Sequence, residues 1–178
     1  WWAMLITMLA VFTAFVSLVF AYFFFWTLHE DFPPGGTNGP GVFWPCVAGA
    51  LFLGAWGATM LARRWNRTDR AAGFYLAMAG ASALTVGGGA AILAGPWFTA
   101  MDPTSHVYPA IVWMLAAWVA LHATAALIML LYCIARRAAG KMTAQHDIDI
   151  HNVALFWHFV AATAVITVAV IAGFPLPS

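Results

Sequence analysis

Five long apolar runs separated by short polar connections limit the folds open to this chain more than any other feature. The runs cover residues 2–26, 42–62, 71–94, 108–135 and 152–173. Each reaches the length of about 20 residues that an α-helix needs to cross the hydrocarbon core of a bilayer. Backbone groups in lipid must satisfy their own hydrogen bonds, and continuous helices do this. The sequence therefore predicts an all-α membrane protein, with five transmembrane helices in one domain over residues 1–178.

The composition supports this class and excludes others. Only 7% of the 178 residues are charged and 64% are hydrophobic, whereas a soluble domain carries about a quarter charged residues. The net charge of +1 offers no basic surface for a nucleic acid, so no nucleic-acid partner is expected. We expect an integral membrane protein.

The distribution of basic residues predicts how the helices are oriented. Every Lys and Arg lies in the second or the fourth connection, and the first and third connections hold only acidic charges. Cytoplasmic loops are the ones enriched in Lys and Arg. We therefore expect the second and fourth connections and the amino end to be cytoplasmic, and the carboxyl end to be outside. The basic residues are Arg63, Arg64, Arg67, Arg70, Arg136, Arg137 and Lys141.

Histidines within or beside the spans are the main candidates for polar contacts. At about 100° per residue, one face of the last helix carries a stripe of histidines and small residues, namely His151, Ala154, His158, Ala161 and Ala162. A helix that faces only lipid has no use for this stripe, so we expect it to face protein. His122 and His158 are expected to be neutral and hydrogen-bonded in helix–helix contacts, and His151 to be solvated or near phosphate. The predicted polar contacts are His122, His151, His158, Trp118 and Trp157.

A haem or quinone site formed by His122 and His158 is the alternative interpretation. At 1.5 Å per residue the two side chains differ in membrane depth by about 10 Å, which is unfavourable for ligands of one iron. No carboxylate lies within any predicted span, which disfavours an independent proton pump. We therefore expect no catalytic residue, cofactor or metal in this chain.

Two loop features have a simple and a functional interpretation. His29, Glu30 and Asp31 are consecutive, and three consecutive loop residues rarely converge on one ion, so a solvated loop is expected. The basic connections lie where anionic lipid headgroups are, so they either bind headgroups or only set the topology. The candidate headgroup contacts are Arg63, Arg64, Arg136 and Arg137.

Small residues recur at every fourth position in the second and third runs. Such ladders let helix backbones approach closely in a membrane. We expect close packing along Gly73, Ala77, Ala81, Thr85 and Gly89 in the third run, and along Ala50, Gly54 and Ala58 in the second.

Three stretches resemble subunit III of the haem–copper oxidases, the cytochrome c and quinol oxidases. The first is Trp1-Trp2-Ala3-Met4 leading to Ala21-Tyr22-Phe23-Phe24. The second is Leu121-His122 followed by Leu127-Ile128-Met129-Leu130 and Arg136-Arg137. The third is the segment from His151 to Val160. The chain resembles the five-helix form of that subunit, or the subunit III part of a chain fused behind subunit I.

This resemblance implies a non-catalytic subunit of a respiratory terminal oxidase in the bacterial inner (plasma) membrane. Such a subunit contacts subunit I, and through the complex subunit II and cytochrome c or quinol. Haem and copper lie in the partner subunits, and phospholipid binds to the subunit itself. Its implied role is to support assembly, lipid binding and sustained proton uptake during oxygen reduction coupled to proton pumping.

Two departures from the family pattern limit what the resemblance implies. The family usually has a glutamate in the helix that corresponds to residues 2–26, where this chain has Val11. An earlier histidine of the penultimate helix is replaced by Val119. Chemistry that depends on those groups is not carried over. A subunit III-like partner of a nitric oxide reductase and an oxidase assembly factor remain alternatives.

Overall fold

The computed structural model describes residues 2–35 and 39–174, and this part of the chain is helical without any strand. Its helices are α1 (Trp2–Leu28), α2 (Phe43–Arg67), α3 (Ala71–Phe98), α4 (Val107–Ala138) and α5 (Ile148–Gly173). All five are long and apolar enough to cross a membrane, which confirms the predicted all-helical membrane class. Trp1, the first residue of the stretch Trp1-Trp2-Ala3-Met4, and residues 175–178, on which the predicted position of the carboxyl end depends, lie outside the described residues.

The helices at the basic end are longer than the apolar runs. Helix α2 continues through Arg63 to Arg67, and α5 begins at Ile148, so that Asp149 lies in a helical first turn rather than in a loop. The apolar runs mark only the part of a helix that lies in hydrocarbon. Basic groups in a last turn and acidic groups in a first turn interact favourably with the helix dipole, so these turns remain helical.

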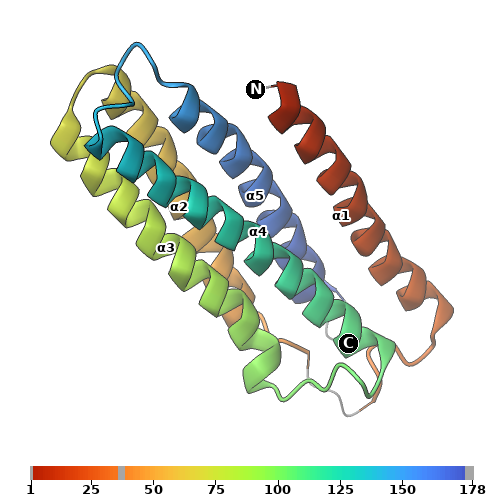
Figure 1. The fold of residues 1–178 in the computed structure, drawn as a ribbon. Coiled ribbons are helices and arrows are strands. Elements are labelled where there is room, and N and C mark those ends of the chain that lie inside the picture. The colour runs from red at the N-terminus through yellow and green to blue at the C-terminus, as the bar shows by residue number, and fades with distance from the viewer. Residues whose placement is uncertain (1, 36–38, 175–178) are drawn as a thin grey trace.

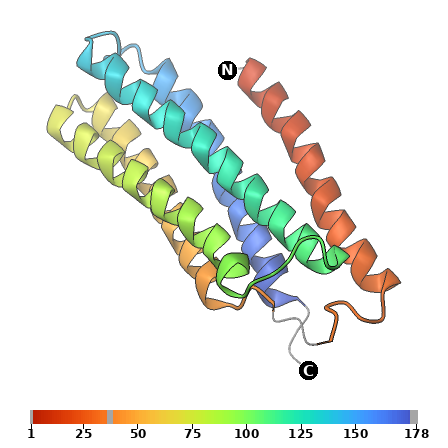
Figure 2. The same ribbon diagram turned by 60° about the horizontal axis from the view of Figure 1, so that its bottom comes forward.

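Helices α2 to α5 form a bundle to which α1 is added at one side. In the bundle, α3 and α5 each lie between α2 and α4 (Figure 1). Among the described helices, α1 contacts only α4 and α5, and it diverges from them toward its amino end (Figure 2). Both basic connections lie at this same end of the molecule. The alternation that the sequence predicted is thus present in the fold.

Helices α2 and α3 have the closest helix–helix contact. A Cβ atom added at Gly88 would lie 2.8 Å from a ring carbon of Phe52, and one added at Gly73 would lie 2.8 Å from the ring of Trp65. The predicted end of the ladder, Gly89, has no such neighbour within 4 Å. A step of four residues turns about 40° beyond a full helical turn, so an every-fourth-residue ladder rotates out of a straight contact.

In the second ladder, Gly54 does approach α3, since a Cβ atom added there would lie 3.3 Å from Cδ1 of Leu84, but the ladder lies at the edge of this contact. Ala50 and Gly54 are exposed, whereas Phe52 and Ala55 are fully buried. The packed face of α2 therefore carries larger side chains, and the small residues that receive them are on α3. This arrangement places Phe52 directly over Gly88.

Helix α1 is held mainly by two aromatic side chains. Phe15 stacks on Trp118 of α4 at a ring-centre distance of 6.4 Å. Nearer the carboxyl end of α1, the Tyr22 hydroxyl donates a hydrogen bond to the carbonyl of Phe174, and its ring contacts Phe32 and Tyr108. Both side chains are buried, while most of the helix surface is exposed.

Candidate functional site

His122 lies in the contact between α4 and α5. Its Nδ1 donates to the carbonyl of Trp118 at 2.7 Å, because a carbonyl oxygen can only accept. The ring packs against Trp118 at 4.6 Å and against Phe156 and Phe159 of α5. His122 thus occupies an aromatic helix–helix contact that continues through Trp118 to Phe15 of α1.

His158 has a different environment although it also lies within a span. Its Nδ1 donates to the carbonyl of Ala154 at 2.6 Å, and its ring meets Trp56 of α2 edge to face at 5.8 Å. The side chain is nevertheless exposed, and so is Ala162, whereas Ala154 and Ala161 are buried. The stripe that we expected to face protein is therefore only partly covered by this chain.

The two imidazoles do not face each other. His122 packs toward Phe156 and Phe159, and His158 packs toward Trp56 on the α2 side of α5. Each ring has its Nδ1 bound to a carbonyl of its own helix, which leaves Nε2 as the atom available to another group. Ligation of one haem iron by both rings would require at least one of them to leave its present neighbours.

Tryptophan N–H groups around α5 lack acceptors. Trp157 is fully buried, and within the described part of the chain the indole N–H groups of Trp56, Trp118 and Trp157 have no hydrogen-bond acceptor. An unpaired polar group in an apolar environment is unfavourable. This part of the molecule therefore has a surplus of donors.

The basic end is organised by contacts between the two connections and the helix ends. Arg63 donates through Nη2 to Nδ1 of His151 at 2.6 Å. A guanidinium has donors only, so His151 accepts and is neutral in this contact. We expected His151 to make a polar contact and to be solvated or near phosphate; in the structure this half-buried ring makes a polar contact that joins α5 to α2.

Two ion pairs connect α5 and the segment before it to the neighbouring helices. Arg67 Nε lies 2.8 Å from Asp147, and Arg136 Nε lies 3.0 Å from Asp149. The first pair joins α2 to the residue before α5, and the second joins α4 to the first turn of α5. Because these groups are partly exposed, the pairs contribute modestly to stability and mainly set the geometry.

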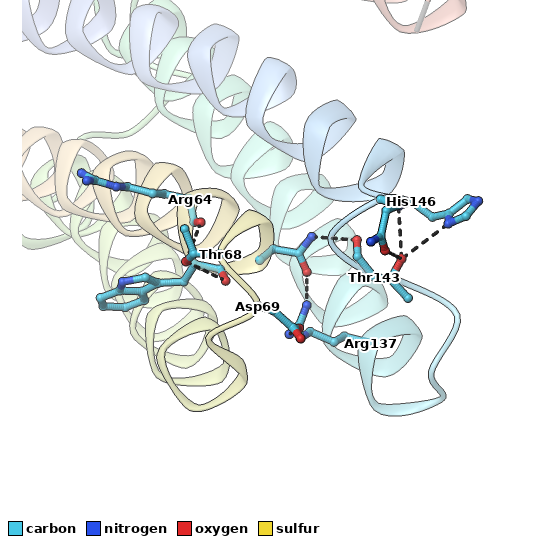
Figure 3. A network of polar contacts seen from close by, with 9 residues as sticks. Arg64, Thr68, Asp69, Arg137, Thr143 and His146 are labelled. Atoms are coloured by element: carbon cyan, nitrogen blue, oxygen red, sulfur yellow. Dashed lines mark hydrogen bonds and ion pairs between the residues drawn. The ribbon is translucent and has the colours of Figure 1, made fainter.

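Asn66 is the central polar residue of this end, and sequence analysis predicted no structural role for it. It is fully buried, its amide donates to the carbonyl of Thr143 at 3.1 Å, and its Oδ1 accepts from Arg137 (Figure 3). Arg137 also lies 3.1 Å from Asp69, and its guanidinium covers the ring of Phe74 at 5.0 Å. Its position as a single asparagine among arginines at the end of an apolar run could have suggested this role.

The four arginines predicted to contact lipid headgroups differ in whether they already have partners within the protein. Arg63, Arg136 and Arg137 are engaged by His151, Asp149 and the Asn66–Asp69 pair. Arg64 is exposed, its guanidinium has no partner among the described residues, and it points away from the polar network in Figure 3. Among these four arginines, Arg64 is the one whose guanidinium has no contact with another described residue.

The sequence matches no protein-family model, and a comparison with curated proteins finds no match either. The resemblance to subunit III therefore rests on the three stretches of sequence that carry it, together with a fold of five membrane-spanning helices.

Proposed function

We propose that this chain is a subunit III-like, non-catalytic membrane subunit of a respiratory haem–copper terminal oxidase. In this proposal the basic end faces the cytoplasm, in agreement with the distribution of Lys and Arg. The redox metals lie in partner subunits, with subunit I as the main contact. The chain supports assembly, lipid binding and sustained proton uptake, and the membrane is the bacterial inner membrane.

Exposure of His158 is the observation that supports this proposal most. Ionisable side chains within a span almost always face protein or a water-filled cavity. His158 is exposed beside Trp56, and its Nε2 is free to accept a hydrogen bond. A partner helix with a donor group against this part of α2 and α5 would satisfy it. An exposed histidine within a span is therefore best explained by a partner subunit that covers it in a larger complex.

The test is to replace His158 with alanine in the complete complex. We expect H158A to lower the yield of co-purifying partner severalfold, while the haem spectrum of each complex that does form is unchanged. Ile166→Ala is the matched control, because Ile166 is an exposed apolar residue of the same helix and should tolerate the change. A large loss of haem signal at unchanged yield of the complex would contradict the proposal.

A membrane cytochrome or quinone anchor is the second candidate. The bonds from Nδ1 of His122 and His158 to helix carbonyls favour it, because a metal-bound histidine commonly donates its other nitrogen in this way. The different neighbours of the two rings disfavour it. A haem spectrum that stays with the chain after its partners have been stripped away would identify this function.

A subunit III-like partner of a nitric oxide reductase, or an assembly factor, would use the same surface. The catalytic subunit that co-purifies with the chain distinguishes these functions from an oxidase. For lipid binding, we propose that Arg64 contacts an anionic headgroup, since its guanidinium is exposed and unpaired among the described residues.

A further inference from the structure

Two histidines and a carboxylate meet at the end of the bundle opposite the arginines. His29 directly follows α1, Asp31 lies in the loop after it, and His106 precedes the first residue of α4. One ligand atom from each of the three lies within 4.8 Å of the others. The sequence places His29 and Asp31 near each other, but His106 comes from a different connection. The expectation of a solvated loop considered only the consecutive residues.

An aromatic cluster brings these connections together. Tyr22 of α1, Phe32 of the following loop and Tyr108 of α4 are all buried. Their rings contact one another pairwise, with Phe32 and Tyr108 at a centre distance of 5.0 Å. Phe32 directly follows Asp31, and Tyr108 lies two residues after His106. Tyr22 lies in α1, seven residues or about two helical turns before His29. The three potential ligands are thus carried by a packed core.

The spacing of the two imidazoles is close to that of a shared metal ion. Their ring centres are 5.7 Å apart and their planes are inclined by 69°. Two imidazoles bound to one tetrahedral zinc through nitrogens about 2.0–2.1 Å from the ion would have ring centres roughly 5 Å apart. Asp31 Oδ2 lies 3.9 Å from Nε2 of His106, and Asp31 is exposed enough to move toward an ion. Only side-chain adjustments are needed.

The charges at this end favour a cation. All Lys and Arg residues of the chain are in the second and fourth connections, so none competes for Asp31 from the first or third. Asp102, the acid of the third connection, is occupied, because the N–H and hydroxyl of Thr104 donate to its Oδ1 at 2.8 and 2.7 Å. These bonds hold the pKa of the Asp102 carboxyl below its usual range. Asp31 remains as a free ligand.

We propose that His29, Asp31 and His106 bind one divalent transition-metal ion of the zinc class. Two imidazoles and a carboxylate suit zinc and its neighbours in the first transition series, and the fourth position would hold water. The ion joins the end of α1 to the start of α4. This matters because α1 has few other contacts with the bundle.

Metal binding has a structural consequence at the start of α4. The backbone N–H of Tyr108 donates to Nδ1 of His106 at 3.1 Å. When a metal binds Nε2 of His106, the single proton of the neutral ring must lie on Nδ1. Nδ1 is then a donor and can no longer accept from the N–H of Tyr108. The metal therefore replaces this capping bond, and the amide of Tyr108 reports on the occupied state.

The experiment is a titration of the complete protein in detergent, carrying a tag without histidines, with Co²⁺ as the visible probe and Zn²⁺ as the competitor. We expect one Co²⁺ per chain, displaced by Zn²⁺, and a shift of the Tyr108 amide resonance in the diamagnetic Zn²⁺ form. His29→Gln should weaken binding at least tenfold. His106→Asn should do the same, and because asparagine caps a helix well, α4 should remain intact.

His146→Gln is the matched control, since His146 is exposed at the other end of the bundle. It should bind Co²⁺ like the wild type. Circular dichroism without metal checks that each variant is folded, and Asp31→Asn provides a further variant that leaves both rings in place. The proposal is overturned by three results: no saturable binding, binding that survives both histidine replacements, or binding lost in H146Q. None of these results bears on the proposed partner surface at His158.

Discussion

At the scale of single residues, Asn66 decides how the basic end is held. The side chain is fully buried and connects α2 to Arg137 of α4 and to Thr143 of the last connection. Its removal would leave a nearly buried guanidinium with one partner fewer and the Thr143 carbonyl without its donor. Buried groups that lose a partner cost more than the bond itself contributes.

We predict that Asn66→Ala lowers the free energy of unfolding by about 1–3 kcal/mol. Denaturant unfolding of the purified protein in detergent measures this. Asn152→Ala is the matched control, because the buried Oδ1 of Asn152 has no partner among the described residues, so its removal should cost less. Equal effects of the two substitutions would show that Asn66 is not the central contact.

Arg64 and Arg67 are neighbouring arginines of α2 with opposite expected roles. Arg67 is paired with Asp147, whereas the guanidinium of Arg64 is free of partners in the described structure. We predict that Arg64→Gln weakens association with anionic lipid and leaves the unfolding midpoint unchanged. Arg67→Gln should lower the midpoint slightly, since an exposed ion pair contributes about 0–1 kcal/mol. Native mass spectrometry with added anionic lipid, together with thermal melts, separates the two effects. Equal lipid loss in both variants would contradict this assignment.

At the scale of helices, the contact between α2 and α3 depends on which glycine faces a ring. We predict that Gly88→Ala destabilises the protein by about 1–3 kcal/mol, because the new methyl group would overlap Phe52 and force the helices apart. Gly89→Ala should be neutral or slightly stabilising, since no atom would lie within 4 Å of its Cβ and alanine is the better helix former. Thermal unfolding of both variants tests this, and similar melting points would refute the contact.

Attachment of α1 depends on Phe15 more than on its other phenylalanines. Phe15 is buried against Trp118, and Phe12 is exposed. We predict that Phe15→Ala broadens and lengthens the distance between spin labels at Ile6 and Ala162, measured by electron resonance in a chain with Cys46→Ala. Phe12→Ala should leave that distance distribution unchanged. An unchanged distribution in the Phe15 variant would mean that other contacts fix α1.

Helix positions could be predicted from the sequence because the thickness and apolar nature of the bilayer core determine the length and hydropathy of a spanning helix. The helix ends could not, since Arg63–Arg67 and Asp149 are polar and still helical. The ladder on α2 was predicted correctly only in part, because an every-fourth-residue pattern rotates around the helix. Gly54 approaches Leu84 of α3, whereas Ala50 is exposed. Hydropathy describes what each segment contacts on average, and it does not identify the neighbouring helix.

At the scale of the whole molecule, the contacts that sequence analysis missed join segments that are distant along the chain. Asn66 meets Arg137, Arg63 meets His151, and His29 meets His106. No local sequence pattern predicts such pairs, because they depend on how the helices are arranged in space. His158 could be recognised from the sequence as an intramembrane histidine, but its exposure could not be predicted.

As proposed, this chain is the non-catalytic partner of a haem-containing membrane subunit. A mild-detergent pull-down of the chain, followed by a reduced-minus-oxidised spectrum with and without carbon monoxide, tests this directly. We expect a carbon-monoxide-reactive haem that belongs to a larger co-purifying subunit and is lost when that subunit is removed. A haem that stays with the isolated chain, or a chain that purifies without partner and without haem, would contradict the proposed function.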